Sequence, residues 1–159
     1  MIYLLKPYYI NLGSRIVKAP KIYFTDIGFV SYLTGTRHRD SLMRGMQAGA
    51  LFENFVVQEL LKHYAHSGRK PPLFYYRTNN GLEVDLVIEE KPGQLKPCEI
   101  KLTQTPHSGM EQSIKRLKEL NKKKNIKFTD GAIISMVSQS FPLSKTTRAY
   151  NLKDFLASL

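Results

Sequence analysis

Three ionisable residues near the middle of the chain, Asp85, Glu99 and Lys101, have types and spacing that could bind a divalent metal ion. Side chains two residues apart on a strand share a face, so Glu99 and Lys101 point the same way if 95–103 is a strand. A turn at 91–94 would bring Asp85 opposite Glu99 or Lys101, depending on register. Facing carboxylates destabilise a ladder and therefore favour a bound cation. Two carboxylates beside a lysine can hold Mg²⁺ and orient a water molecule against a phosphodiester.

A further carboxylate, Glu53, lies in the clearest helical segment, 49–66. At 100° per residue the apolar side of this helix consists of Val56, Val57, Leu60 and Tyr64. The polar side, which we expect to face solvent, consists of Asn54, Gln58, Lys62 and Ala65. Glu53 falls within the apolar arc, where a carboxylate is costly to bury unless it is paired, hydrogen-bonded or bound to metal. The alternative is a glutamate favoured only by the dipole near the helix N-terminus.

Periodicity and turn signals predict the elements that position these side chains. Short strands and a helix at 26–33 are expected in residues 1–35, and 36–48 lacks periodicity and is interpreted as a mobile connector. From residue 49 the pattern predicts helices at 49–66, 107–124 and 152–158, and strands at 73–78, 83–90, 95–103, 131–137 and 146–151.

The predicted order α-β-β-β-α-β indicates an α/β sandwich around a mixed central sheet flanked by helices. Three antiparallel strands form a meander in it, because Asn80-Gly81 signals a hairpin turn and 91–94 a second one. We expect residues 49–159 to form this domain and residues 1–48 to be an N-terminal appendage.

Composition narrows the classes of partner. The chain has 159 residues, 42% of them hydrophobic, and a formal net charge of +11, which favours nucleic acid first and an anionic membrane second. A positive face that is merely solvated would have the same charge. The single cysteine, Cys98, excludes an internal disulfide and a Cys-rich zinc site, and a cytoplasmic setting is expected. No apolar run approaches the roughly 20 residues that a membrane helix needs, so no membrane partner is expected.

Basic side chains form the candidate nucleic-acid contacts. The run 115–127 is rich in lysine, and we expect Lys115, Lys118 and Lys122 to contact phosphates without reading sequence. A solvated helix face explains the same composition equally well. Arg77 could contact a phosphate or simply cover the sheet, and Gln112 could face the acidic site or be an ordinary exposed helical glutamine.

The order of elements, with Asp85, Glu99-x-Lys101 and a helical Glu53, resembles the PD-(D/E)xK, or restriction-endonuclease-like, nuclease superfamily. The resemblance implies that Asp85 and Glu99 bind Mg²⁺ or Mn²⁺ and that Glu53 assists directly or through water. It implies that Lys101 positions or activates the attacking water, and the Ile100 carbonyl is expected as a further ligand. Val84 stands where the superfamily's name has a proline.

A second resemblance covers nearly the whole chain. Its motifs are Lys21-x-Tyr23-Phe24-x-Asp26-x-Gly28, Gly49-x-Leu51-Phe52-Glu53-x-Phe55-Val56, Tyr75-Tyr76-Arg77, Glu83-Val84-Asp85 and Glu99-Ile100-Lys101. Together they are similar to the C-terminal domain of unknown function that follows the ATPase module in many prokaryotic AAA+ proteins. That domain is thought to be nuclease-like, and the resemblance implies an ATPase as an upstream half or as a separate partner. The chain itself has no G-x-x-x-x-G-K-[ST] loop, and 45–49 offers neither lysine nor hydroxyl, so we expect no ATP site.

Three possibilities therefore stay open. The first is a nuclease-like domain that hydrolyses DNA phosphodiesters with Mg²⁺ or Mn²⁺. The alternative is a non-catalytic DNA- or protein-binding module that works with an ATPase. A third possibility is a domain that folds but has lost its function, with a homodimer interface built from the aromatic-rich residues 1–35.

Overall fold

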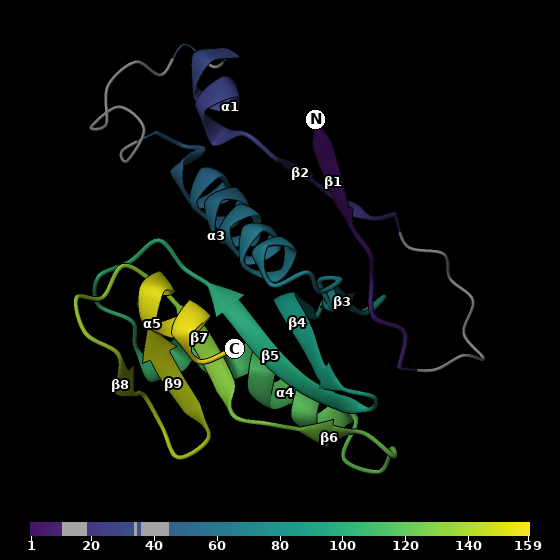
Figure 1. The fold of residues 1–159 in the computed structure, drawn as a ribbon. Helices are drawn as coiled ribbons and strands as arrows, with labels where there is room; N and C mark the ends of the chain where they lie inside the picture. Colours follow the sequence, from purple (N-terminus) through teal and green to yellow (C-terminus); the bar gives the residue numbers. More distant parts are fainter. Residues whose placement is uncertain (11–18, 34, 36–44) are drawn as a thin grey trace.

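The structure is a computed structural model that describes residues 1–10, 19–33, 35 and 45–159. Within these residues the chain forms a mixed α/β fold around a seven-stranded sheet (Figure 1). The strands in spatial order are β3 (Leu73–Arg77), β4 (Glu83–Lys91), β5 (Gln94–Ile100), β7 (Gly131–Ile134), β9 (Thr147–Tyr150) and β8 (Phe141–Pro142), and the short β6 (Lys127–Phe128) also pairs with β5.

The predicted meander and the mixed character of the sheet are confirmed. Strands β3, β4 and β5 pair antiparallel, whereas β7 is parallel to both β5 and β9. The turn between β4 and β5 places Pro92 at its second position and Gly93 at its third, with φ of 74° at Gly93. Because a type II turn requires positive φ at the third position, this glycine closes the hairpin without strain.

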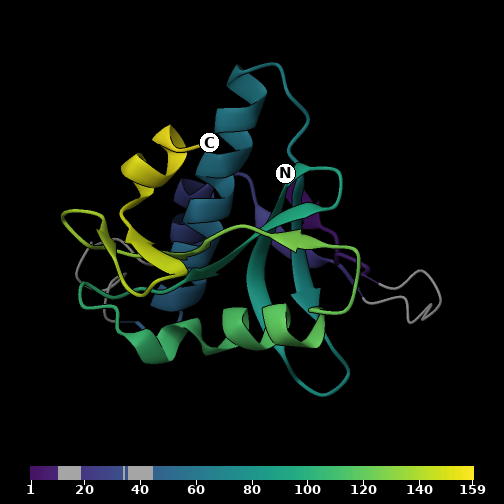
Figure 2. The ribbon, with the colours of Figure 1, turned by 90° about the horizontal axis from the view of Figure 1, so that it is seen from below.

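Helices cover both faces of the sheet (Figure 2). Helices α3 (Ala48–His66) and α5 (Leu152–Ala157) lie on one face, and the 3₁₀ turn η1 (Ser108–Glu111) and helix α4 (Gln112–Leu120) lie on the other. A buried apolar cluster lies on each face of the sheet. Leu86 packs with Leu60 of α3 and Phe155 of α5, while Val84 packs with Leu117 of α4.

A separate two-stranded antiparallel sheet precedes α3 and consists of β1 (Ile2–Leu5) and β2 (Lys21–Phe24). Helix α1 (Ile27–Leu33) follows, and the Asp26 carboxylate accepts a hydrogen bond from the Phe29 N–H at 3.0 Å, as expected of an N-cap. Leu5 and Tyr23 belong to the main apolar cluster, so this unit contacts the same core as α3. The boundary between residues 48 and 49 stays a prediction.

The prediction that the polar side of α3 faces solvent is confirmed at Lys62 and Ala65, which are exposed, and is wrong at Asn54. Asn54 is only 7% exposed, because its side-chain amide accepts a hydrogen bond from the Phe24 N–H at 2.8 Å and donates one to the Phe24 carbonyl at 2.7 Å. Gln58 donates to the Thr25 carbonyl at 2.9 Å. The part of the polar side nearer the helix N-terminus therefore packs against β2 and the residue that follows it.

Several predicted helices and strands were longer than those in the structure. Helix α4 ends at Leu120 rather than at residue 124, and the Asn121 side chain donates to the Leu117 carbonyl at 2.8 Å as the chain turns. Strand β5 ends at Ile100 rather than at residue 103, and β7 at Ile134 rather than at residue 137. Of the predicted connector, 36–44 lies outside the described residues, and 48 is already the first residue of α3. No described helix combines the length and apolar character needed to cross a bilayer.

Candidate metal site

Asp85 lies at an irregularity in β4. Phe74 pairs with Val87 and Tyr76 pairs with Val84, so β4 carries one more residue than β3 over this stretch. Such a β-bulge reverses which face the following side chains point to. Val84 accordingly packs on the α4 side and Leu86 on the α3 side, whereas a regular strand would place side chains two residues apart on one face. The bulge therefore sets the direction of the Asp85 side chain.

The structure brings Asp85, Glu99 and Lys101 together. The Lys101 ammonium lies 2.9 Å from Asp85 Oδ2 and 2.6 Å from Glu99 Oε2. The backbone N–H of Ile100 also donates to Asp85 Oδ2, at 3.0 Å. Leu86 pairs with Cys98, so the next position along the ladder sets Asp85 beside Glu99. Lys101 follows the end of β5, yet its N–H still donates to the Ile134 carbonyl at 3.0 Å, which fixes its backbone.

Burial and charge move the pKa values of the two carboxyls in opposite directions. Burial raises the pKa of Asp85, but the Lys101 charge and the hydrogen bonds from Ile100 and Lys101 outweigh it, and the net shift is downward. Burial and the Asp85 charge raise the pKa of Glu99 to about 7, against the opposing effect of Lys101. Burial lowers the pKa of Lys101, but the two carboxylates raise it by more than burial lowers it. The net shift is upward, so Lys101 stays charged.

One oxygen of this group lacks a partner. Glu99 is only 2% exposed, and its Oε1 atom is buried without a hydrogen bond among the described residues. A buried acceptor of this kind is costly unless something satisfies it. Mg²⁺ is usually held by one or two carboxylates together with water molecules, so the oxygen atoms of Asp85 and Glu99 fit a hard divalent cation.

The carboxylates open into a pocket of about 340 Å³. Its lining residues are Gly81, Leu82, Glu83, Asp85, Glu99, Lys101, Gln112, Ser113 and Arg116. Gln112 is exposed on α4, as an ordinary helical glutamine would be, and it also lines this pocket. Arg116 was not predicted as a site residue. Its spacing of four from Gln112 places both on one face of α4, which is the signal that sequence analysis could have used.

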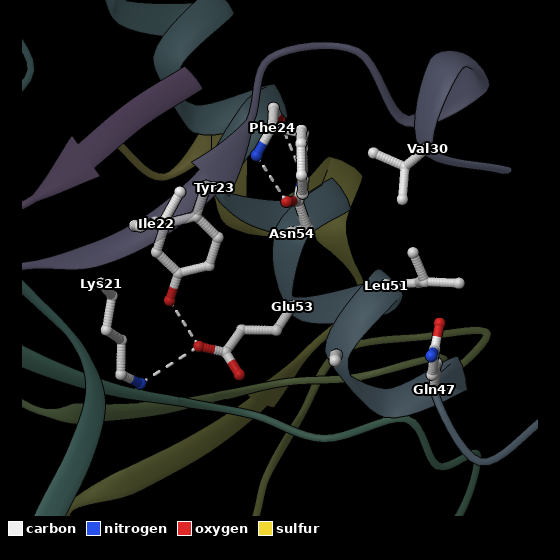
Figure 3. Close-up of a pocket in the computed structure, with 10 residues that line it drawn as sticks. Lys21, Ile22, Tyr23, Phe24, Val30, Gln47, Leu51, Glu53 and Asn54 are labelled. Atoms are coloured by element: carbon white, nitrogen blue, oxygen red, sulfur yellow. Dashed lines mark hydrogen bonds and ion pairs between the residues drawn. The ribbon is translucent and has the colours of Figure 1, made fainter. Parts of the chain in front are cut away.

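Glu53 joins a different set of contacts, on the side of β4 that faces α3. Its carboxylate accepts a hydrogen bond from the Tyr23 hydroxyl at 2.5 Å and lies 3.2 Å from the Lys21 ammonium (Figure 3). Lys21 also lies 2.6 Å from Glu83 Oε1. In the part of the chain that the structure describes, no group of three or more His, Cys, Asp or Glu residues has a metal-binding arrangement. The assisting role of Glu53 and the Ile100 carbonyl ligand stay predictions.

A second pocket, of about 420 Å³, lies beside Glu53 between β2, α1 and α3 (Figure 3). It is lined by Lys21, Ile22, Tyr23, Phe24, Val30, Gln47, Ala50, Leu51, Glu53 and Asn54. Lys21 and Tyr23 come from the segment preceding α3, and neither was predicted as a site residue. Their two-residue spacing on a strand was the available signal, because it places both on one face.

The predicted phosphate-contacting residues have different surroundings. Arg77 is exposed and lies 3.4 Å from Glu83, and Lys115 lies 2.7 Å from the buried carboxylate of Glu111. Lys118 is half-buried, and burial lowers its pKa. Lys122 is exposed in the turn after α4. The basic run therefore extends past one helix face, and its contact with nucleic acid stays a prediction.

Comparison with known proteins gives a family but no activity. A family model described as a domain of unknown function, DUF4143, matches residues 48–155. Uncharacterized proteins of Mycobacterium bovis and Mycobacterium tuberculosis are each 38% identical to this chain over 102 residues, which cover 64% of the chain and 22% of each relative. The match thus spans about a fifth of the length of these relatives. No solved structure matches the chain. Because the family model covers more than half of its residues, this chain belongs to the DUF4143 family.

Proposed function

We propose that this chain is a nuclease-like domain that hydrolyses DNA phosphodiester bonds with Mg²⁺ or Mn²⁺ held by Asp85 and Glu99. The observation that carries the proposal is the convergence of these two carboxylates on Lys101, with a buried Glu99 oxygen left unpartnered. The order α3, β3, β4, β5, α4, β7 supports the likeness to the PD-(D/E)xK nucleases, since it is the order that the resemblance requires. In this reading the fold is restriction-endonuclease-like.

The proposed reaction assigns a role to five of the residues that line the pocket. A bound divalent ion would lower the pKa of a coordinated water and offset charge on the phosphate. Asp85 and Glu99 supply the ligand oxygens. Lys101 is placed to hold a water molecule or a phosphate oxygen beside them, because its ammonium contacts both carboxylates. Gln112 and Arg116 border the same pocket and would orient the phosphate backbone.

The net charge of +11 supports a polyanionic substrate. We propose that Arg77, Lys115, Lys118 and Lys122 hold the DNA backbone without reading its sequence. An ATPase, in the same longer protein or as a separate chain, is the partner that the second resemblance implies. The much greater length of the mycobacterial relatives leaves room for such a half in those proteins.

The second candidate function is a DNA-binding module without catalysis. One observation favours it: the described residues hold no cluster of three candidate metal ligands. Such a module would bind DNA with strong salt dependence and would cleave nothing.

The test combines calorimetric titration of Mn²⁺ with cleavage of linear and single-stranded DNA. We expect the wild-type chain to bind Mn²⁺ and to cleave, and Asp85→Asn and Glu99→Gln to lose at least tenfold in both. Glu119→Gln is the matched control, because Glu119 is an exposed carboxylate on α4 outside the pocket lining. DNA binding without Mn²⁺ affinity would favour the non-catalytic module. Ion affinity that is unchanged in both Asp85 and Glu99 variants would eliminate the proposed site.

A further inference from the structure

Lys21 and Glu83 connect the two groups of carboxylates near the site. Glu83 lines the pocket with Asp85 and Glu99, and the Lys21 ammonium lies 2.6 Å from Glu83 and 3.2 Å from Glu53. Glu53 of α3 and Glu83 of β4 are thus bridged by one lysine. Lys101 also bridges Asp85 and Glu99, but there a buried Glu99 oxygen is left without a hydrogen bond among the described residues. Glu53, by contrast, also accepts from Tyr23, and Glu83 also pairs with Arg77. The lysine that does this comes from β2, far from α3 and β4 in the sequence.

The backbone of β2 holds Lys21 in place. Asn54 binds both the N–H and the carbonyl of Phe24, and the Tyr23 hydroxyl donates to Glu53. The Lys21 ammonium also lies 5.6 Å from the centre of the Tyr75 ring, a cation–π distance. Its side chain is only 23% exposed. These contacts hold the Lys21 ammonium in one position, whereas a solvated surface lysine moves freely.

The charges explain what this lysine does. Without Lys21, Glu53 would keep only the Tyr23 hydroxyl and Glu83 only the exposed Arg77 guanidinium among the contacts described above. Two carboxylates would then lie together with no shared cation, and their oxygens could take a second divalent ion. We propose that Lys21 is a built-in cation that takes the place of a second metal ion between Glu53 and Glu83, so that the site binds one divalent ion, at Asp85 and Glu99. This inference rests on the proposed function for the Asp85–Glu99 ion. Glu53 then acts through Lys21 and is a positioning residue.

The first test counts bound Mn²⁺ ions by calorimetric titration. We expect one ion in wild type, two in Lys21→Met, and one again in the double variant Lys21→Met/Glu83→Gln. Lys21→Arg keeps the positive charge and should bind one ion. Lys62→Met is the matched control, because Lys62 also pairs with a glutamate, Glu59 at 2.7 Å, but on the outer surface of α3. One ion in both wild type and folded Lys21→Met would overturn the role of Lys21.

The two proposals fail in different ways in this experiment. If wild type binds no ion but Lys21→Met binds one, the proposed Asp85–Glu99 ion is refuted and the proposed role of Lys21 is supported. No ion in either protein would overturn both. Loss of the ion in Asp85→Asn, together with a second ion in Lys21→Met, supports both.

A second test needs no substitution and applies if Lys21→Met does not fold. Reductive methylation of the wild-type chain, read out residue by residue by mass spectrometry, reports how free each lysine is. We expect Lys21 to be methylated at least tenfold more slowly than exposed Lys153, with and without saturating Mn²⁺. A Lys21 that becomes as reactive as Lys153 when Mn²⁺ is added would show that the ion displaces it, and this result would overturn the inference.

Discussion

Asp85 and Glu99 share one ammonium group, and Asp85 receives a backbone hydrogen bond in addition. Lys101 lies 2.9 Å from Asp85 and 2.6 Å from Glu99, and the Ile100 N–H donates to Asp85 alone. Burial and the Asp85 charge raise the pKa of Glu99 to about 7, whereas at Asp85 the Lys101 charge and the Ile100 hydrogen bond outweigh burial and lower the pKa. The pair therefore holds a proton near neutral pH that a divalent cation would have to displace.

Glu99→Gln should become more stable relative to wild type as pH rises from 5 to 8. The folded-state pKa of Glu99 is about 7, above its ordinary value of 4.5. The stability contributed by its protonated form is therefore complete below pH 4.5 and is lost as pH rises through 7. Glutamine cannot ionise, so the variant should gain about 1–3 kcal/mol over this range. Urea denaturation at each pH measures the gain, and a difference that does not change with pH would refute it.

Mn²⁺ affinity should fall at acid pH because the ion competes with the Glu99 proton. Below about pH 7 the ion must displace that proton, so the apparent affinity should drop by close to tenfold per pH unit and level off above 7. Titrations in two buffers with different ionisation enthalpies count the released protons. We expect between half a proton and one proton per ion at pH 6.5, and almost none at pH 8.5. Equal release at both pH values would contradict the prediction.

Sequence analysis found the carboxylate pair because local signals determine it. Pro92-Gly93 closes the hairpin, and β5 runs on through Cys98, Glu99 and Ile100, all three of which are buried. The bulge at Asp85 could not be predicted, since the extra residue in β4 is defined only against its partner β3. A regular strand would have placed Val84 and Leu86 on one face.

The contacts between β2 and α3 were missed for a related reason. Helical periodicity placed Asn54 on the solvent-facing side of the helix. The periodicity shows which residues are polar, but it does not show that β2 packs against this side. Lys21 and Glu53 are 32 residues apart, and no local pattern predicts that they meet. Tertiary pairing of this kind, and not propensity, determined the surroundings of Glu53.

Asn54→Ala should lower the free energy of unfolding by about 2–4 kcal/mol. The substitution removes two part-buried hydrogen bonds, to the Phe24 N–H and to the Phe24 carbonyl, that the Asn54 amide makes from its buried position on α3. Gln58→Ala is the comparison, because it removes one hydrogen bond, to Thr25, and should cost about 1 kcal/mol. Urea denaturation of both variants gives the two values. Similar costs would mean that Asn54 does not hold β2 against α3.

Arg116→Ala should weaken DNA binding and reduce its salt dependence. Arg116 is exposed on α4, it borders the pocket that holds Asp85 and Glu99, and no ion pair involving it occurs among the described residues. A guanidinium in this position can contact one phosphate, so the slope of log affinity against log salt should decrease by about 0.9. Fluorescence anisotropy with labelled DNA, without divalent ions to prevent cleavage, measures this slope. Lys153→Ala removes one charge from α5, across the sheet from α4, and should leave the slope within error of wild type. Equal decreases in both variants would mean that net charge, and not the pocket beside Asp85, determines binding.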